Sequence, residues 1–213
     1  MTTTNETVDE PTTVDETVPT DRVPTESVPT DTVPTDSVPT DTVPTGERAD
    51  LVSALDKHRH FLRLTVRGLD DEQAARRTTV SELCLGGLIK HVTEVESGWA
   101  DFILEGPTSL SGGTEGWDRD DVATSWLQKF QMLPAERLAD LLERYEDVAR
   151  RTDRIAASVD LDAGHPLPEA PWFEPGVRWS ARRVLLHIIA ETAQHAGHAD
   201  IIREALDGSK SMG

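Results

Sequence analysis

The chain has 213 residues, of which 39 are acidic and 21 basic, and its formal net charge is −18 at pH 7. Nucleic acids and anionic membrane surfaces both attract basic segments, so this charge argues against either kind of partner. The single cysteine, Cys84, excludes an intrachain disulfide and fits a reducing cytoplasm. The sequence shows neither a signal peptide nor an apolar run approaching the ~20 residues of a membrane helix, so we expect a cytoplasmic protein.

Residues 1–46 differ from the rest of the chain in composition. The triplet Val-Pro-Thr recurs every five residues from Val18 to Val43, and the segment holds ten acids against one Arg, which is half of the net charge. Recurrent proline opposes helix formation, and few side chains are available for a core, so we predict a disordered, extended tail. Its role is that of a solubilising tail, a spacer or a Thr-rich target for modification.

Residues 47–213 have the pattern of a single all-α domain. Apolar residues recur at intervals of three and four along four stretches, as in helices that bury one face. These predicted helices cover residues 48–68, 84–104, 134–159 and 180–206. Ser180 is a suitable N-cap for the last helix, and Gly106 and Gly208 are suitable stops. No stretch shows the sustained alternation of a strand, so we expect a helical bundle.

Two long loops, about 106–123 and 160–179, separate these helices. They contain most of the large aromatic residues outside the helical stretches: Trp117, Trp172, Phe173 and Trp179. Long loops that carry aromatic side chains often line a binding site. We therefore expect these four side chains to form the walls of a pocket.

The last predicted helix carries the most informative pattern. Its three histidines and one glutamate follow one another at offsets of four, four and three residues: His187, Glu191, His195 and His198. Such offsets place side chains on one side of a helix, and Val184 and Ile202 on the same stripe suggest that this side faces inward. Buried imidazoles and a carboxylate are costly unless they are paired or bind a metal. A Glu and a His one turn apart can reach the same cation.

A further ligand has to come from another helix, and His91 is the best candidate. It lies between Leu88 and Val95 on the apolar side of the second predicted helix. A bundle core brings such positions together with those of a facing helix. The alternative is that His91 is a core histidine held by a hydrogen bond, without any metal.

Other chemistries fit the sequence less well. The zinc-protease pattern His-Glu-x-x-His is absent, and the Glu-x-x-His pairs of di-metal bundles have only a reversed counterpart, His91-x-x-Glu94. No Gly-rich phosphate loop or Gly-x-Ser-x-Gly elbow is present. Cys84 stands at a predicted helix start, where a thiol can be activated as a nucleophile. The favoured interpretation of Cys84 is a small buried or capping residue.

Two segments together resemble a known group of proteins. Residues 88–99 read LIKHVTEVESGW, and residues 187–204 read HIIAETAQHAGHADIIRE. Over about 48–207 the chain resembles the DinB-like superfamily, and within it the actinobacterial branch of mycothiol transferases, also called mini-circle proteins. This resemblance implies an up-down-down-up four-helix bundle. It also implies a divalent metal held by one His of the second helix and two residues four apart on the last.

The resemblance assigns the metal to His91, Glu191 and His195. Many members have His at both positions on the last helix, whereas Glu191 matches the thiol-dependent maleylpyruvate isomerase relatives. His187 and His198 are not standard ligands of the group. They are candidates for neighbours that orient the ligands, as such partners normally do.

The resemblance also implies a function, which we state as an expectation. Zinc is the first candidate for the metal and nickel the second, and a low-molecular-weight thiol such as mycothiol is the co-substrate. The protein would be an S-transferase or isomerase acting on small electrophiles, because a metal-bound thiol becomes a thiolate. The alternatives are a non-catalytic metal-binding bundle of a stress response and a bundle without metal. The sequence leaves open whether the chain forms a homodimer.

Overall fold

The structure is a computed structural model that describes residues 45–110, 128–170 and 173–211. The predicted tail lies outside the described residues except for its last two. Trp117 and Trp172 also lie outside them.

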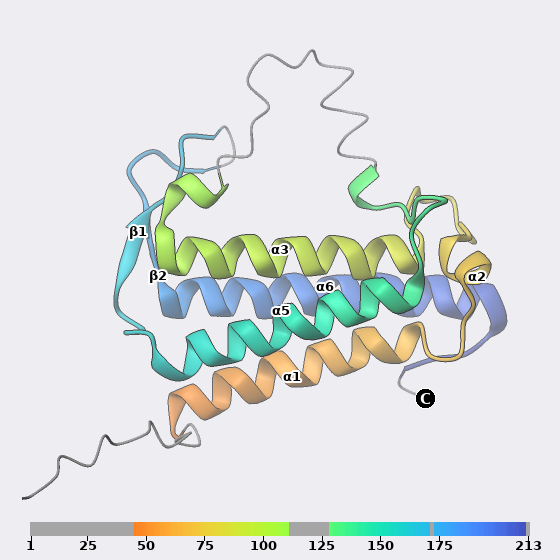
Figure 1. Cartoon of the computed structure of the whole chain (residues 1–213), viewed down its shortest axis with the longest axis horizontal. Coiled ribbons are helices and arrows are strands. Elements are labelled where there is room, and N and C mark those ends of the chain that lie inside the picture. Colours follow the sequence, from red (N-terminus) through yellow and green to blue (C-terminus); the bar gives the residue numbers. More distant parts are fainter. Residues whose placement is uncertain (1–44, 111–127, 171–172, 212–213) are drawn as a thin grey trace, which may run out of the picture. The chain divides into compact units, whose positions relative to one another are not determined.

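Four long helices make up the described bundle (Figure 1). They are α1 (Glu47–Thr65), α3 (Leu85–Glu105), α5 (Leu138–Ser158) and α6 (Ala181–Asp207). Helix α1 packs mainly on α6, and α3 packs on both α5 and α6. Helices α3 and α5 run in the same direction, opposite to α1 and α6. The predicted up-down-down-up, all-α bundle is therefore confirmed.

Short elements connect the long helices. A five-residue helix, α2 (Asp71–Ala75), precedes α3, and a 3-10 turn, η1 (Pro107–Leu110), follows it. Two strands that the sequence did not predict, β1 (Gly164–Pro166) and β2 (Arg178–Ser180), pair antiparallel. Three residues are too few to show an alternating pattern. The pairing ties the two ends of the long loop together just before α6 begins.

The helix ends follow the predicted signals, with two differences. Helix α1 ends at Thr65, before the predicted Gly68. Gly106 and Gly208 adopt positive φ at the ends of α3 and α6, and the Ser180 hydroxyl accepts a hydrogen bond from Arg183 N at the start of α6. Helix α5 was expected to begin near Pro134 but begins at Leu138. An acidic side chain accounts for this, because the carboxylate of Asp71 in α2 accepts the Leu138 N–H and caps the helix there.

Two apolar clusters fill the bundle, one toward each end, and a polar layer separates them. On α1, Leu55 belongs to one cluster and Leu62 to the other, with Arg59 between them. On α3, Glu96 lies one turn after Val92 of the first cluster, at the level of Arg59. Both Arg59 and Glu96 are completely buried. Charged side chains therefore lie in the middle of the core, where each needs a partner.

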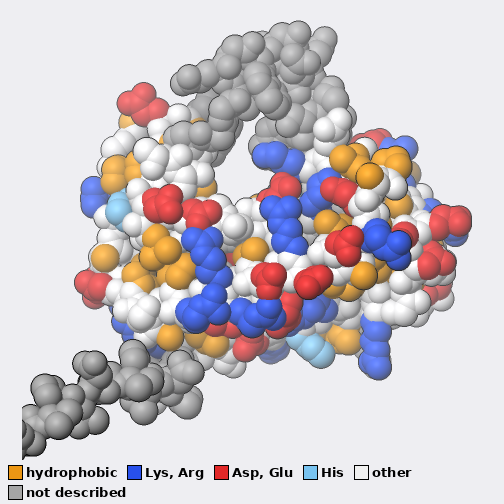
Figure 2. All heavy atoms as spheres, in the orientation of Figure 1, with side chains coloured by type: hydrophobic (Ala, Val, Ile, Leu, Met, Phe, Trp, Pro, Cys, Tyr) orange, Lys and Arg blue, Asp and Glu red, His pale blue; other side chains and the backbone are white. Residues whose placement is uncertain are grey.

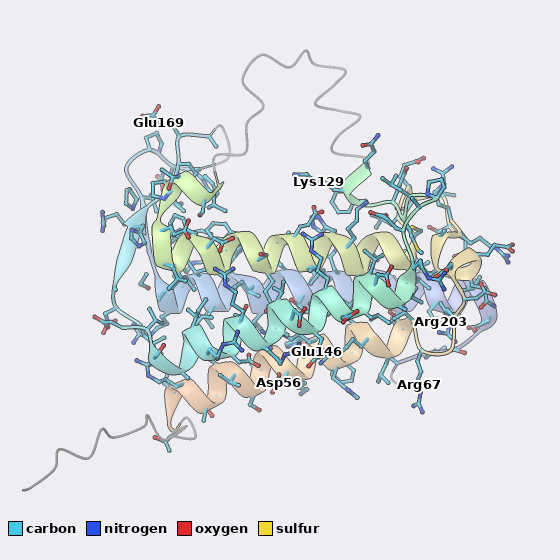
Figure 3. The ribbon with its side chains drawn as sticks, viewed as in Figure 1. Asp56, Arg67, Lys129, Glu146, Glu169 and Arg203 are labelled. Carbon is cyan, nitrogen blue, oxygen red and sulfur yellow. The ribbon has the colours of Figure 1, made fainter. Side chains whose placement is uncertain are left out.

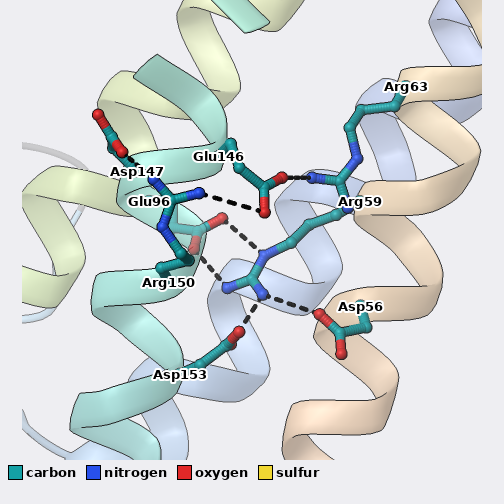
Figure 4. A network of polar contacts seen from close by, with 8 residues as sticks. All are labelled: Asp56, Arg59, Arg63, Glu96, Glu146, Asp147, Arg150 and Asp153. Atoms are coloured by element: carbon teal, nitrogen blue, oxygen red, sulfur yellow. Dashed lines mark hydrogen bonds and ion pairs between the residues drawn. The ribbon is translucent and has the colours of Figure 1, made fainter. Parts of the chain in front are cut away.

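Arg59 has such partners on three helices (Figure 4). Its guanidinium donates to both oxygens of Glu96, at 2.5 and 3.3 Å, and to Asp153 of α5 at 2.8 Å. Asp56, one turn earlier on α1, lies at 3.3 Å. Burial disfavours the cation, but the carboxylates outweigh this effect and raise the pKa of Arg59. The network is internally satisfied and fixes α1, α3 and α5 to one another.

The outer surface of α1 and α5 carries acidic and basic side chains in close alternation (Figure 2). Arg63 of α1 and Glu146 of α5 form an ion pair at 2.6 Å. At the far end of α1, Arg203 of α6 donates to the carbonyl oxygens of Thr65 and Arg67, both at 2.9 Å (Figure 3).

None of the described helices combines the length and apolar character needed to cross a bilayer.

Candidate metal centre

Helix α3 presents His91 toward α6. Leu88 and Val92, on the same side of the helix, are almost completely buried, and His91 itself is only 7% exposed. On α6, His195 is 8% exposed and lies beside the core residue Ala196. Because α3 and α6 pack together, the two imidazole rings meet edge to face, with their centroids 4.7 Å apart.

The three histidines and Glu191 of α6 do not all face inward. His195 is buried, whereas His187, Glu191 and His198 are half-buried. The side chains of His187 and Glu191 are 23% and 29% exposed, against 10% for His195. Solvent can therefore reach this centre from the side of His187 and Glu191, while the His91 side is closed by the core.

Three of the predicted site residues come together. His91, Glu191 and His195 each offer one ligand atom, and these atoms all lie within 4.8 Å of one another. Nε2 of His195 lies 3.6 Å from Oε2 of Glu191. Among the described residues, this is the group of His, Cys, Asp or Glu side chains whose ligand atoms converge in this way.

The three residues fit a divalent metal chemically. Two imidazole nitrogens and one carboxylate oxygen form a common donor set for zinc. In a tetrahedral zinc site, bonds of about 2.0–2.2 Å place two ligand atoms about 3.3–3.6 Å apart. The three ligand atoms, now within 4.8 Å of one another, would therefore have to move closer, by on the order of 1 Å for the widest pair, to bind one ion.

The other two histidines of α6 lie against these residues without joining the group. Nδ1 of His198 lies 3.5 Å from Nδ1 of His195. Nε2 of His187 lies 3.7 Å from Oε1 of Glu191. His198 thus lies beside His195, and His187 lies beside Glu191. This arrangement supports their interpretation as residues that orient ligands.

The electrostatic environment favours the protonation states that a metal needs. Burial, assisted by the neighbouring His195, lowers the pKa of His91 to about 4. Burial also lowers the pKa of His187. Contact with His195 lowers the pKa of Glu191, against the effect of burial. At neutral pH His91 is therefore a neutral imidazole and Glu191 a carboxylate, the forms that bind a cation.

Phe130 covers one side of the centre. Its ring lies on His91 with centroids 4.1 Å apart. Gly86 and Gly87 make this contact possible, because a Cβ on Gly87 would overlap the Phe130 carbonyl and one on Gly86 would press on Met132. The sequence analysis missed Phe130. Two consecutive glycines in the first turn of a helix were a signal of close backbone approach.

Cys84 belongs to this packing contact rather than to the converging group. It is 2% exposed and lies at the N-cap position of α3 without capping it through its side chain. Its sulfur accepts a hydrogen bond from Met132 N at 3.4 Å and lies 3.8 Å from the Phe130 carbonyl oxygen. The structure thus agrees with a small buried residue at the helix start.

Aromatic side chains pack on the other side of the centre. Trp99 of α3 stacks on Trp179 at 4.9 Å, and Phe173 meets both rings edge to face. His187 packs edge-on against Trp99 at 4.8 Å and Trp179 at 5.1 Å. The guanidinium of Arg183 covers Trp179 at 4.3 Å. Of the four predicted wall residues, Phe173 and Trp179 therefore lie beside the centre.

A groove of about 790 Å³ lies elsewhere, between the end of α1, α2 and the start of α5. Arg63, Asp71 and Leu138 are among its lining residues. Basic and acidic side chains both line it, and it contains none of the converging ligand atoms. Volume alone does not define a site, so we assign the chemistry to the converging residues.

Comparison with known families identifies the class of protein that carries this helical bundle and its converging His–Glu–His group. Residues 50–208 match the family described as mycothiol-S-transferase. This match covers well over half of the chain, so the protein belongs to that family, and the resemblance seen in the sequence is confirmed. The curated proteins include no match to it.

Proposed function

We propose that this protein is a metal-dependent S-transferase that joins a low-molecular-weight thiol, of the mycothiol type, to a small electrophile. The metal would be held by His91, Glu191 and His195. The observation that carries the proposal is the convergence of these three ligand atoms within 4.8 Å, in a chain that belongs to the mycothiol-S-transferase family. Zinc suits this donor set best, and nickel is the second candidate.

A bound divalent cation would supply Lewis acidity that converts the thiol to its thiolate at neutral pH. The protein residues provide the conditions for this. His91 stays neutral because it is buried, and Glu191 contributes one negative charge. Phe130 and the core exclude water on the closed side, so the thiol would enter beside Glu191.

The electrophile would lie near the aromatic group of Trp99, Phe173 and Trp179. These side chains adjoin the more exposed side of the centre through His187. An apolar substrate would bury its surface against the exposed edges of Phe173 and Trp179. In the reaction the sulfur forms a bond to carbon, the leaving group departs with the electron pair of the broken bond, and the thiol proton passes to solvent.

The test is conjugation of a panel of thiols, including mycothiol, to a chlorinated or an epoxide substrate. Metal-loaded protein should form the conjugate faster than metal-free protein, and turnover should require added thiol. Cys84→Ser should keep this activity, because Cys84 lies in the contact with Phe130 and Met132. Conjugation no faster than in metal-free protein, across the whole panel, would overturn the proposal.

A non-catalytic metal-binding bundle is the second candidate. It is favoured by the groove of about 790 Å³, which lies away from the converging residues. A closed metal shell would support this alternative. Addition of thiol to cobalt-substituted protein distinguishes the two, because only an open coordination position gives a sulfur-to-cobalt charge-transfer band.

A further inference from the structure

Glu191 lies between two histidines of its own helix, one turn before it and one turn after it. Its Oε2 faces His195, at 3.6 Å from Nε2. Its Oε1 faces His187, at 3.7 Å from Nε2. The two oxygens of one carboxylate therefore lie close to different histidines, and Oε2 is the one beside His195 of the proposed metal site.

The ring of His187 has little freedom to move away from this position. Trp99 and Trp179 contact it edge to face, at 4.8 and 5.1 Å between centroids. Trp179 is itself held by stacking on Trp99 and by the guanidinium of Arg183 over its ring. Three elements, α3, β2 and α6, thus fix one imidazole beside Glu191.

The chemistry of His187 and Glu191 determines which of the two side chains donates the proton. A carboxylate only accepts hydrogen bonds, so the His187 nitrogen that faces Oε1 must carry the proton. A short movement of either side chain closes the present 3.7 Å separation to a hydrogen bond. The alternative orientation, with an unprotonated Nε2 facing Oε1, would set two acceptors against each other.

We propose that His187 is a positioning residue that holds Oε1 of Glu191 and leaves only Oε2 for the metal. A carboxylate can bind a cation through one oxygen or through both. Holding Oε1 keeps the second oxygen from occupying the coordination position that a thiol needs. This inference rests on the proposed function for the presence of the metal, but it concerns how Glu191 is held and does not depend on turnover.

Two substitutions at this position separate hydrogen bonding from packing. His187→Phe keeps a flat ring between Trp99 and Trp179 but cannot donate. His187→Gln loses the ring but keeps a donor. His60→Phe, at an exposed position of α1, is the matched control for the same substitution away from the centre. Each full-length protein is loaded with Co²⁺, and its visible spectrum is recorded before and after addition of 2-mercaptoethanol.

Wild type, His187→Gln and His60→Phe should give one spectrum, with strong visible absorption and a charge-transfer band on addition of thiol. His187→Phe should still bind one Co²⁺ but absorb more weakly, because a second carboxylate oxygen raises the coordination number. Its apparent affinity for 2-mercaptoethanol should fall by about 10-fold or more, the usual cost of losing a partner that orients a ligand. Identical spectra and thiol affinities in His187→Phe and wild type would overturn the inference, as would an equal loss in His187→Gln.

A second measurement needs no substitution. Nitrogen NMR of the imidazoles in zinc-loaded wild type should show His187 protonated at Nε2, and protonation at Nδ1 alone would overturn the inference even if His187→Phe fails to fold. Failure of the proposed function has a different signature. In that case the spectra still separate the variants, but no thiol conjugate forms. A wild-type protein that binds no Co²⁺ overturns both.

Discussion

The bundle core holds two groups of charged or polar side chains that differ in how they are satisfied. Around Arg59, a guanidinium meets Glu96 and Asp153 at hydrogen-bonding distances, and cation and anions are paired within the protein. Around Glu191, a carboxylate lies 3.6 and 3.7 Å from two histidines. These atoms lie close together but beyond hydrogen-bonding distance.

The difference shows that buried polar side chains can either stabilise the fold or form a binding site. A guanidinium and a carboxylate complement each other in charge and geometry, so the first group is complete and excludes further partners. Imidazole nitrogens and carboxylate oxygens can all bind a metal, so under the proposed function a cation would complete the second group. The following predictions test this contrast, from the largest expected effect to the smallest.

Glu96→Ala should be the most destabilising substitution. It leaves Arg59 buried with only part of its charge compensated, and breaking such a pair typically costs about 3–5 kcal/mol in the free energy of unfolding. Urea denaturation measures the loss. The matched control replaces both partners, Arg59→Met with Glu96→Leu, and should recover most of the stability because no buried charge remains. A mild effect of Glu96→Ala would contradict the view that the network is closed.

The single substitutions His91→Ala, Glu191→Ala and His195→Ala should act on metal binding and far less on folding. Each removes a proposed ligand, so metal affinity should fall by more than the roughly 10–100-fold that loss of an orienting partner costs. His187→Ala and His198→Ala should lower it less. Metal analysis of protein purified without chelator provides the measurement. Equal metal content in wild type and the three ligand variants would rule out the assignment.

Gly87→Ala should loosen the closed side of the centre. The added Cβ would overlap the carbonyl of Phe130, so the segment that carries this ring must move off α3. Overpacking of this kind costs about 1–3 kcal/mol, and the contact between Phe130 and His91 should weaken. Thermal unfolding measures the first effect and metal affinity the second. Gly197→Ala on α6, where a Cβ meets nothing within 4 Å, is the control and should not destabilise the protein.

The stability of the metal-free protein should fall as the pH is lowered from 6.5 toward 4. The folded-state pKa of His91 is about 4, below the ordinary value of 6.5, so within this window the unfolded chain binds a proton that the folded chain does not. The loss from His91 should reach about 3 kcal/mol, from a shift of about 2.5 pKa units, and then level off. Denaturation of wild type and His91→Gln at several pH values isolates it, because the variant lacks this group. Parallel pH profiles would contradict the prediction.

Deletion of residues 1–44 should have the smallest effect. The cut is placed before Gly46, whose carbonyl accepts the hydrogen bond of Asp50 N at the start of α1. The deleted segment holds the Val-Pro-Thr repeats and few core-forming residues, so the thermal midpoint should change by no more than a few degrees. A large decrease would show that the tail packs on the bundle.

The sequence by itself determined the helices and the composition of the site. Periodic apolar residues, Ser180 and the glycines that end helices are local signals, so the four long helices could be located from the sequence. The start of α5 was wrong, because its cap is Asp71, a residue far away in the chain, and α1 ends at Thr65, before the predicted Gly68. The offsets between Glu191 and the histidines of α6 are also local, since a helix fixes which residues share a side.

Tertiary structure decided which of these residues meet and how each is held. The approach of His91 to His195 depends on the packing of α3 against α6, and Phe130 reaches His91 only because two glycines admit its backbone. Likewise, the aromatic contacts that fix His187 join α3 to the strand before α6. Such contacts link residues distant in the chain, and their geometry depends on how whole helices pack. The pattern of one helix cannot contain that information.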